Sequence, residues 1–466
     1  MYKDNGISEL IYEYLHTCLS FNRYPYGTPF PSIHEIAMRF HVAKETVRKI
    51  YKRLACEGFI RMDERKQTIS CYHKKEDTSY TLAYFHNCRY LYEDLLQSTS
   101  LLFSGIMQEA AKALTKKDRQ KILAILDDDQ QYHLENITHI CLIYLAKLHN
   151  ELIISFFLQL IHFLRFPYLL HHDMINDLDF LFAEKTSILI LKDKLTHYPN
   201  SPWKDTYINM PARYIHYFQA YLDAHPIQQQ KSATIPFQWS LQHRHSQQCY
   251  SIATALLVKL DDAEYVEGTY LPSHHELVQS LQVSNSTIRR ALDLLDGMGI
   301  IKTKKGKGRY VYTACNDCDI TYERSSVQKM LKQYQQSLSF LELIVPAVIT
   351  QLPMHATFDF THLKQLVEKQ EEYLMGYAIL QQLLKVSELV VVKECIRTLY
   401  QIQLWGKQLS HVLQMQQHDK TITQYACSFM QAIEKQDYTT AAQSAYALFH
   451  AQTTATTTWL HAHLIK

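Results

Sequence analysis

One segment of this 466-residue chain occurs twice, and that repetition constrains the fold more than any other feature. Residues Phe30–Ile60 read FPSIHEIAMRFHVAKETVRKIYKRLACEGFI, and residues Leu271–Ile301 read LPSHHELVQSLQVSNSTIRRALDLLDGMGII. The two segments align without a gap at a spacing of 271 − 30 = 241 residues. Because similar segments at a fixed spacing indicate duplicated structural units, the sequence predicts a chain of two halves with similar architecture.

Each copy of the repeat predicts three helices and a hairpin. In the second copy, a helix over about 250–261 is followed by a turn, and Ser273 then caps a second helix with Glu276 at capping-box spacing. Ser284 is the natural cap of a third helix, and Gly299 suits the left-handed position that ends it. Two short strands around a turn follow, so the pattern predicts a winged helix-turn-helix. The first copy repeats the pattern with a poorer cap on its third helix.

Long stretches rich in Leu, Ile, Tyr, Gln and Lys follow each copy, and the whole chain has only 11 glycines and 12 prolines. Such a scarcity of helix breakers predicts helical bundles, and hence a mainly α fold with two small β wings. The apolar run Leu152–Leu164 is short and interrupted by polar residues, which indicates a buried helix and not a membrane span. The expected domains are a winged helix-turn-helix DNA-binding domain over 1–75, a helical effector-like domain over 79–230, a second winged helix-turn-helix DNA-binding domain over 244–314 and a second helical effector-like domain over 320–466.

The second copy resembles the winged-helix domain of GntR-family transcription regulators. The residues that carry the resemblance are Leu271-Pro272-Ser273, Glu276-Leu277, Val283-Ser284-Asn285-Ser286-Thr287-Ile288-Arg289, Gly299-Ile300-Ile301 and the wing Gly306-Lys307-Gly308. The first copy matches from Pro31 to Ile60, but RMDERKQTISCY stands where the second copy has the wing KTKKGKGRYVYT. The resemblance implies a transcription regulator that binds double-stranded DNA and is not an enzyme. In agreement with this, the sequence has no Gly-rich phosphate loop, nucleophile elbow or HExxH motif.

The helical regions more weakly resemble the all-helical effector domain of the FadR-like branch of this family. The best piece is Gln431–Gln452, QAIEKQDYTTAAQSAYALFHAQ, which looks like the last helix pair of that domain. Many such domains hold a metal with histidines. The corresponding positions here are Ala378, Ala426 and Leu448 in the second half and Cys141 in the first. The resemblance therefore implies no metal and no other cofactor, and the identity of any small-molecule effector stays open.

A helix that reads DNA needs hydrogen-bond donors near its N-terminal turn, where it enters the major groove. Arg and Asn are the usual readers of guanine and adenine, and Ser and Thr tend to hold phosphate. The candidates in the first copy are Ser32, His34, Lys44, Thr46, Arg48 and Lys49; those in the second are Ser273, His275, Ser284, Asn285, Ser286, Thr287, Arg289 and Arg290; and those in the second wing are Lys305, Lys307 and Arg309. A flexible basic hairpin such as that wing suits contact with the minor groove or the backbone.

The start of the second helix departs from the family pattern in both copies. The resemblance implies an arginine there, whereas this chain has His34 and His275. A histidine changes its charge near neutral pH, so we expect the phosphate contact at this position to be weaker or dependent on pH.

A tandem chain can supply both half-sites of an operator by itself, as a monomeric pseudo-dimer, or can pair as a homodimer. The recognition helices are unequal, with Lys44-Glu45 in one and Asn285-Ser286 in the other, which predicts an asymmetric operator. The helical domains are expected to sense an effector or to pair with another copy of the chain. A ligand would set operator affinity by changing the relative placement of the two winged helices. A helical bundle lined by Tyr, His and Gln would suit a small polar effector.

Other interpretations stay open from the residues alone. The winged helices could hold protein partners instead of DNA, or one copy could survive only as a scaffold. The net charge of the whole chain is only +2, so any affinity for nucleic acid must come from local clustering of charge. Cys315–Cys318 has the spacing of a metal knuckle without a second pair, and His171–Asp173 could ligate a metal; a linker and the end of a surface helix are the simpler interpretations. The sequence begins without a signal-peptide pattern, so we expect a cytoplasmic protein with no membrane partner.

Overall fold

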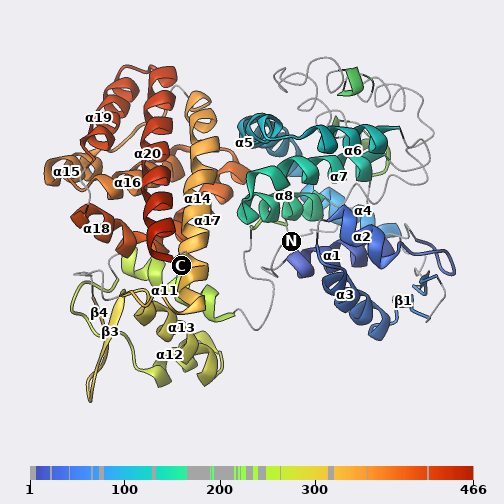
Figure 1. The fold of residues 1–466 in the computed structure, drawn as a ribbon, viewed down its shortest axis with the longest axis horizontal. Coiled ribbons are helices and arrows are strands. Elements are labelled where there is room, and N and C mark those ends of the chain that lie inside the picture. The colour runs from blue at the N-terminus through green and yellow to red at the C-terminus, as the bar shows by residue number, and fades with distance from the viewer. Residues whose placement is uncertain are drawn as a thin grey trace. The chain divides into compact units, whose positions relative to one another are not determined.

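The chain divides into two compact units, Met1–Leu241 (unit 1) and Gln242–Lys466 (unit 2), both rich in helix (Figure 1). The structure is a computed structural model, and it describes all residues except 1–6, 21–23, 41, 64–66, 73–77, 128–132, 165–188, 190, 194–214, 217–218, 221, 227–234, 240–247, 263, 313–319, 354, 417–418 and 465–466.

Unit 2 begins with three helices and a hairpin, which form its winged-helix part. These elements are α11 (Gln248–Asp261), α12 (His274–Leu281), α13 (Asn285–Gly297), β3 (Ile301–Lys304) and β4 (Gly308–Val311). The strands are antiparallel, with Ile301 opposite Val311. The apolar faces of α11 and α13 meet in a small core that completely buries Ile288 and Leu295. This packing leaves the other face of α13 in solvent.

The rest of unit 2 is a helical bundle. Its helices are α14 (Ser325–Thr350), α15 (Thr361–Lys369), α16 (Met375–Val386), α17 (Val390–Trp405), α18 (Lys407–Gln416), α19 (Lys420–Glu434) and α20 (Tyr438–Leu464), with a short 3-10 helix, η7 (Glu372–Leu374), before α16. The long helices α14 and α20 lie side by side, with α17 against α14 and α19 against α20 (Figure 1). Their facing sides form a core in which Phe340, Ile344 and Leu448 are completely buried.

Unit 1 also begins with three helices and a hairpin. These are α1 (Ile7–Ser20), α2 (Ile33–Arg39), α3 (Lys44–Cys56), β1 (Ile60–Arg61) and β2 (Ile69–Ser70). The strands are antiparallel, with Ile60 opposite Ser70. Tyr51 of α3 is completely buried, and its hydroxyl donates to the carbonyl of Pro31 at 2.6 Å, which fastens α3 to the turn before α2.

The helices that follow in unit 1 are α4 (Thr78–Cys88), η1 (Arg89–Leu91), α5 (Tyr92–Lys112), α6 (Lys116–Leu126), α7 (His133–Leu145), η2 (Ala146–Leu148) and α8 (Glu151–Leu164). The apolar run predicted to be a buried helix is α8, and its Phe156 is completely buried against Trp239, with 4.9 Å between the ring centroids. Among the residues that the structure describes, no helix has the length and apolar character needed to cross a membrane.

Several predictions from the sequence have a clear outcome. The mainly α fold with small two-stranded sheets is confirmed. Gly58 and Gly299 have φ angles of +81° and +71°, as expected for residues that end helices. A helix pair covers Gln431–Gln452, as the end of α19 and the first part of α20. The four domain boundaries stay a prediction, and the segments Cys315–Cys318 and His171–Asp173 lie outside the described residues.

Candidate nucleic-acid interface

Serine caps fix the start of both helices in the helix-turn-helix of unit 2. The Ser273 hydroxyl accepts the Glu276 N–H at 3.3 Å, and the Glu276 carboxylate accepts the Ser273 N–H at 2.7 Å. Ser284 caps α13, because its hydroxyl accepts the Thr287 N–H at 3.2 Å. An N-cap holds the first turn of a helix in one geometry, so the residues at the tip of α13 have fixed backbone positions. Both caps were predicted and are confirmed.

The solvent face of α13 carries most of the predicted reading residues. Asn285, Ser286, Arg289 and Arg290 are exposed, and Thr287 is half-buried. Residues four apart share one side of a helix, so Asn285 and Arg289 are neighbours on the exposed face. Arg290 lies closer to α11, where its charge opposes the rise that burial causes in the pKa of Tyr250. Asn285 and Arg289 therefore form a neighbouring pair on the exposed face of α13.

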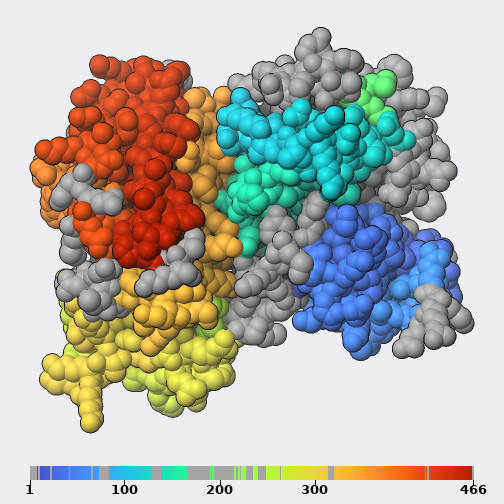
Figure 2. All heavy atoms as spheres, viewed as in Figure 1, coloured from blue at the N-terminus to red at the C-terminus, as the bar shows by residue number. Residues whose placement is uncertain are grey.

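The β3–β4 wing presents two further predicted residues. Lys305 and Lys307 are exposed at the turn, and Figure 2 shows the tip of this hairpin, in yellow-orange, projecting from the surface of unit 2. Gly306 and Gly308 have φ angles of +78° and +106°, values that residues other than glycine rarely adopt. The glycines thus permit the tight turn, and the turn places two ammonium groups where a DNA backbone could contact them.

Arg309, predicted as a DNA contact, has a partner within the protein. Its guanidinium donates to the carboxylate of Asp293 on α13 at 2.7 Å, and its side chain is only 23% exposed. Arg309 therefore fastens the wing to the reading helix, and its contact with DNA stays a prediction. Asp293 could not be predicted from the sequence, because the pair forms only when β4 folds back on α13.

The histidine at the start of the second helix is exposed in both copies, as His34 in α2 and His275 in α12. The Nε2 atom of His275 lies 3.0 Å from the side-chain nitrogen of Gln279, one turn further along α12. Because both side chains are exposed, the phosphate contact expected at these two positions stays a prediction.

In unit 1 the corresponding candidates lie at the start of α2 and α3. Ser32 is exposed and forms a capping box with Glu35, with N–H to oxygen distances of 3.1 and 3.4 Å. Ala43 precedes α3 without any side-chain cap, as expected from the sequence. On α3, Lys44 and Lys49 are exposed, Thr46 is half-buried, and Arg48 is exposed but forms an ion pair with Glu45 at 2.5 Å.

A polar junction that the sequence did not indicate joins the winged-helix part of unit 2 to its bundle. Asp261 at the end of α11 accepts hydrogen bonds from the Tyr400 hydroxyl and, at 3.3 Å, from the Lys407 ammonium. Burial and the neighbouring Asp261 carboxylate raise the pKa of Tyr400 above its usual value, so the phenol stays a donor. The indole of Trp405 also donates to Thr254 at 3.0 Å. These contacts hold α11 against α17 and α18.

The positions expected to have lost metal-binding histidines are all buried. Ala378, Ala426, Leu448 and Cys141 are between 0% and 5% exposed. The histidine nearest in sequence to the last of these positions is His450, which lies on the surface with its Nδ1 atom 2.9 Å from a carboxylate oxygen of Glu342. Within the described part of the chain, no cluster of His, Cys, Asp and Glu has the arrangement of a metal site.

The family model for bacterial regulatory proteins of the gntR family matches residues 250–311, which span α11 to β4. Two solved structures are similar to this chain. One is Lar, described as controlling the expression of the Listeria monocytogenes agr system and mediating virulence; it has 16% sequence identity and a TM-score of 0.23, over 46% of this chain and 99% of that one. The other is a GntR protein of Streptococcus agalactiae, with 17% identity and a TM-score of 0.22, over 44% of this chain and 99% of that one. Similarity at this level assigns neither ligand nor operator. The match over residues 250–311 shows that the winged-helix part of unit 2 is similar to the DNA-binding domain of the gntR family of bacterial regulatory proteins.

Proposed function

We propose that this single chain carries two DNA-reading heads, one formed by α1–α3 and the β1–β2 hairpin and the other by α11–α13 and the β3–β4 hairpin. The observation that supports the proposal is a set of backbone hydrogen bonds that recur at the 241-residue spacing of the repeat. In unit 1 the Gly27 N–H donates to the Ser70 carbonyl at 2.8 Å, and in unit 2 the Gly268 N–H donates to the Val311 carbonyl at 3.0 Å.

The recurrence extends through each hairpin. The Phe30 N–H donates to Thr68 at 2.8 Å, and the Leu271 N–H donates to Arg309 at 2.9 Å. Further along, the Cys71 N–H donates to Phe59 at 2.8 Å, and the Tyr312 N–H donates to Ile300 at 2.9 Å. The same backbone donors and acceptors pair at corresponding positions of the two copies, even though the first hairpin has no wing glycines. This correspondence favours a duplicated domain over a chance similarity in sequence.

The two heads present different chemistry to DNA. The first offers the lysines Lys44 and Lys49, which act as point charges suited to phosphate, whereas the second offers Asn285 and Arg289, which can bind base edges through two hydrogen bonds. A single chain with two unlike reading helices suits an operator whose half-sites differ. Linkage of the heads within one chain also raises the effective concentration of the second head once the first has bound.

We infer that an effector or a pairing partner acts through the helical regions. In unit 2 the reading head is fastened to its bundle by Asp261, Tyr400 and Lys407. A signal in this bundle can therefore change DNA affinity in two ways: by moving unit 2 as a whole, or by breaking the junction at Asp261. Either change alters how the two heads are presented to adjacent grooves.

The test of this proposal is footprinting on DNA fragments selected from a random pool, with one variant for each head. We expect Arg289→Ala to abolish protection of one half-site and Lys49→Ala to weaken protection of the other. Arg397→Ala is a matched control, because Arg397 is an exposed arginine on α17, away from both reading helices. The mass of the complex in solution should correspond to one chain on each operator.

Three results would contradict the proposal. A perfect palindrome bound by two chains would mean that the chain pairs like an ordinary dimeric regulator. Full protection by Lys49→Ala with loss only in Arg289→Ala would leave the first head as a scaffold. DNA affinity that does not fall as salt rises would exclude phosphate contacts and favour a role in holding protein partners, since phosphate binding releases counterions.

A further inference from the structure

The winged-helix part of unit 2 and its bundle form between them a cavity of about 240 Å³, the junction cavity, beside Asp261. One wall comes from the winged-helix part, with Leu257 of α11 and Val311 of β4, and the other from the bundle, with Leu404 of α17 and His411 of α18. Pockets for drug-sized ligands have roughly 300–1,000 Å³, whereas apolar cavities of about 150 Å³ in other proteins bind benzene. The junction cavity therefore suits a small molecule.

Most of the surface inside the junction cavity is apolar. The aliphatic side chains that line it are Leu257, Leu260, Val266, Ile300, Val311 and Leu404. Val266 is 59% exposed, so it lies where the cavity opens to solvent and continues the apolar walls outward. The body of a ligand that covered these side chains would gain the free energy of removing apolar surface from water.

The charged side chains around the junction cavity disfavour a charged ligand. The Lys407 ammonium donates to the Asp261 carboxylate at 3.3 Å, so these two charges already balance one another. Glu267 lies beside Val266 and is exposed. Burial lowers the pKa of His411 below its usual value, and the Lys407 charge acts in the same direction, so the imidazole is uncharged near neutral pH. Surroundings that disfavour a charge on this imidazole disfavour a charge on its ligand too.

His411 is the polar group that the junction cavity still offers. Within the described part of the chain its half-buried imidazole forms no hydrogen bond and no ion pair, and neither ring nitrogen is sealed inside the protein. A neutral imidazole has one donor and one acceptor nitrogen, so it can bind either a hydroxyl or a carbonyl group.

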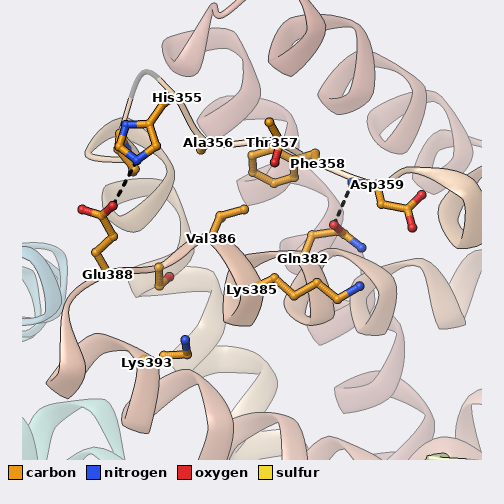
Figure 3. A pocket seen from close by; sticks show the side chains of 12 residues that line it. His355, Ala356, Thr357, Phe358, Asp359, Gln382, Lys385, Val386, Glu388 and Lys393 are labelled. Carbon is orange, nitrogen blue, oxygen red and sulfur yellow. Dashed lines mark hydrogen bonds and ion pairs between the residues drawn. The ribbon is translucent and has the colours of Figure 1, made fainter.

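A larger hollow beside the C-terminal end of α16 shows the contrast (Figure 3). Its volume is about 850 Å³, but its polar side chains are partners of one another or of the backbone. His355 lies 3.2 Å from Glu388, and Gln382 accepts the Asp359 N–H at 2.9 Å. These groups are already engaged, whereas the imidazole of His411 is not.

We propose that the junction cavity binds a small uncharged molecule with an apolar body and one hydroxyl or carbonyl group, which forms a hydrogen bond with His411. The aliphatic walls and Val266 hold the body of the molecule, and the imidazole fixes its orientation. An ionised group would lose its water without gaining an unpaired counter-charge, so the cavity selects against acids and amines of the same size.

A molecule in the junction cavity touches both the winged-helix part and the bundle. Two contacts that join these parts lie in its walls: the ion pair of Lys407 with Asp261, and the hydrogen bond that the Gln408 side chain donates to the Tyr312 carbonyl at 3.3 Å. Binding therefore favours the placement of the reading head in which both walls contact the ligand, and DNA affinity changes with it. This consequence for DNA rests on the proposed function, whereas binding of the molecule does not.

Binding is tested by isothermal titration calorimetry of the full chain with hexan-1-ol, hexylamine and hexanoate, which have bodies of the same length and differ in charge. We expect hexan-1-ol to bind with about one molecule per chain. The two ions should bind about tenfold more weakly or not at all, because a charge that leaves water without a partner is costly.

Two variants of the cavity and one control identify the site. His411→Phe keeps a ring but removes the hydrogen-bonding atoms, so it should weaken hexan-1-ol binding by about two- to tenfold, the usual effect of one hydrogen bond. Val266→Ser removes apolar surface where the cavity opens and should weaken binding by about twofold. His461→Phe is the matched control: it changes an exposed histidine on α20, outside the cavity, and should bind like the parent chain.

The thermal unfolding of each variant shows whether it is folded, and Val266→Ser, at an exposed position, keeps the test valid if His411→Phe is not. The proposal is overturned if hexan-1-ol does not bind at about 10 mM, if either ion binds as tightly as the alcohol, or if both cavity variants bind like the parent chain. A chain that binds hexan-1-ol and no DNA contradicts the proposed function and leaves the cavity assignment intact.

Discussion

Asp293 of α13 is bound by arginines from two sides, because Arg309 of β4 donates to its carboxylate at 2.7 Å and Arg324 at the start of α14 donates to its carbonyl at 3.4 Å. One residue of the reading helix therefore contacts both the wing and the helical bundle. The wing is a two-stranded hairpin, which has little stability by itself, so the contact with α13 is what orients its lysines relative to Asn285 and Arg289.

The first prediction concerns this pair. We expect Arg309→Ala and Asp293→Ala to weaken DNA binding by similar small factors, about two- to fivefold, because each breaks a partly exposed ion pair that contributes about 1 kcal/mol or less. The double variant should bind no more weakly than either single variant. Fluorescence anisotropy with labelled operator DNA measures these affinities.

A second observable separates a fastening role for Arg309 from a direct contact with phosphate. If Arg309 also contacts phosphate, Arg309→Ala alone will flatten the dependence of affinity on salt, by about one unit of slope on a double-logarithmic plot. Asp293→Ala removes no cation, so its slope should equal that of the parent chain in both cases.

The second prediction concerns the different caps of α3 and α13. Ala43 before α3 has φ −65° and ψ 141°, and Ser284 before α13 has φ −67° and ψ 150°. Because the backbone already has the geometry of a capped position, Ala43→Ser should stabilise α3 by about 1 kcal/mol, with the new hydroxyl accepting the Thr46 N–H. Ser284→Ala should destabilise α13 by a similar amount.

Hydrogen exchange of the first-turn amides measures both changes locally, which matters because a chain of two units need not unfold in one step. Ala55→Ser serves as the control, since position 55 lies near the other end of α3 and a serine there caps nothing. Slower exchange in the control than in Ala43→Ser would mean that the gain does not come from the cap.

Features that depend on neighbouring residues could be predicted from the sequence, whereas contacts between residues far apart in the chain could not. Caps such as Ser284 and left-handed glycines such as Gly299 act within four or five residues, so their residue types alone indicate the structure. The contact of Asp261 with Tyr400 joins residues 139 positions apart, and it exists only because α11 packs on α17.

The third prediction concerns acid stability in unit 1. Asp118, at the start of α6, accepts hydrogen bonds from the Lys147 ammonium at 2.6 Å and from the Thr115 N–H at 2.9 Å. Burial acts to raise the pKa of this carboxyl, but the hydrogen bonds from Lys147 and Thr115 outweigh it and lower the pKa to about 2. The ordinary value is 3.8, so the stabilisation is fully present above about pH 4 and is lost as the pH falls toward 2.

We expect urea unfolding of unit 1 to show this loss between about pH 4 and pH 2. Asp118→Asn should be less stable than the parent chain at neutral pH and should lose less stability over that interval. Glu109→Gln is the control, because Glu109 is exposed and its ion pair with Lys112 lies on the surface of α5. Equal pH dependence in Asp118→Asn and the parent chain would mean that other carboxyl groups cause the loss.

The last prediction tests how α17 and α18 are joined. Gly406 separates these helices, and a Cβ atom at this position would lie 2.1 Å from a ring carbon of Tyr334. That ring is almost completely buried, and its hydroxyl lies 3.0 Å from the Ser410 hydroxyl, so it has no room to move aside. Gly406→Ala should therefore destabilise unit 2 by about 1–3 kcal/mol, as overpacking of a core does.

Two further variants identify the cause of that loss. Gly297→Ala should cost less, because its nearest neighbour would be a side-chain carbon of Val327 at 3.2 Å. Adding Tyr334→Leu to Gly406→Ala should restore part of the stability by removing the ring that the new methyl group meets.

Gly406 directly precedes Lys407, so a shift of α18 also draws the Lys407 ammonium away from Asp261. Gly406→Ala is thus expected to weaken the DNA affinity of unit 2 together with its stability, and unchanged DNA binding in a destabilised variant would mean that the junction does not position the reading head.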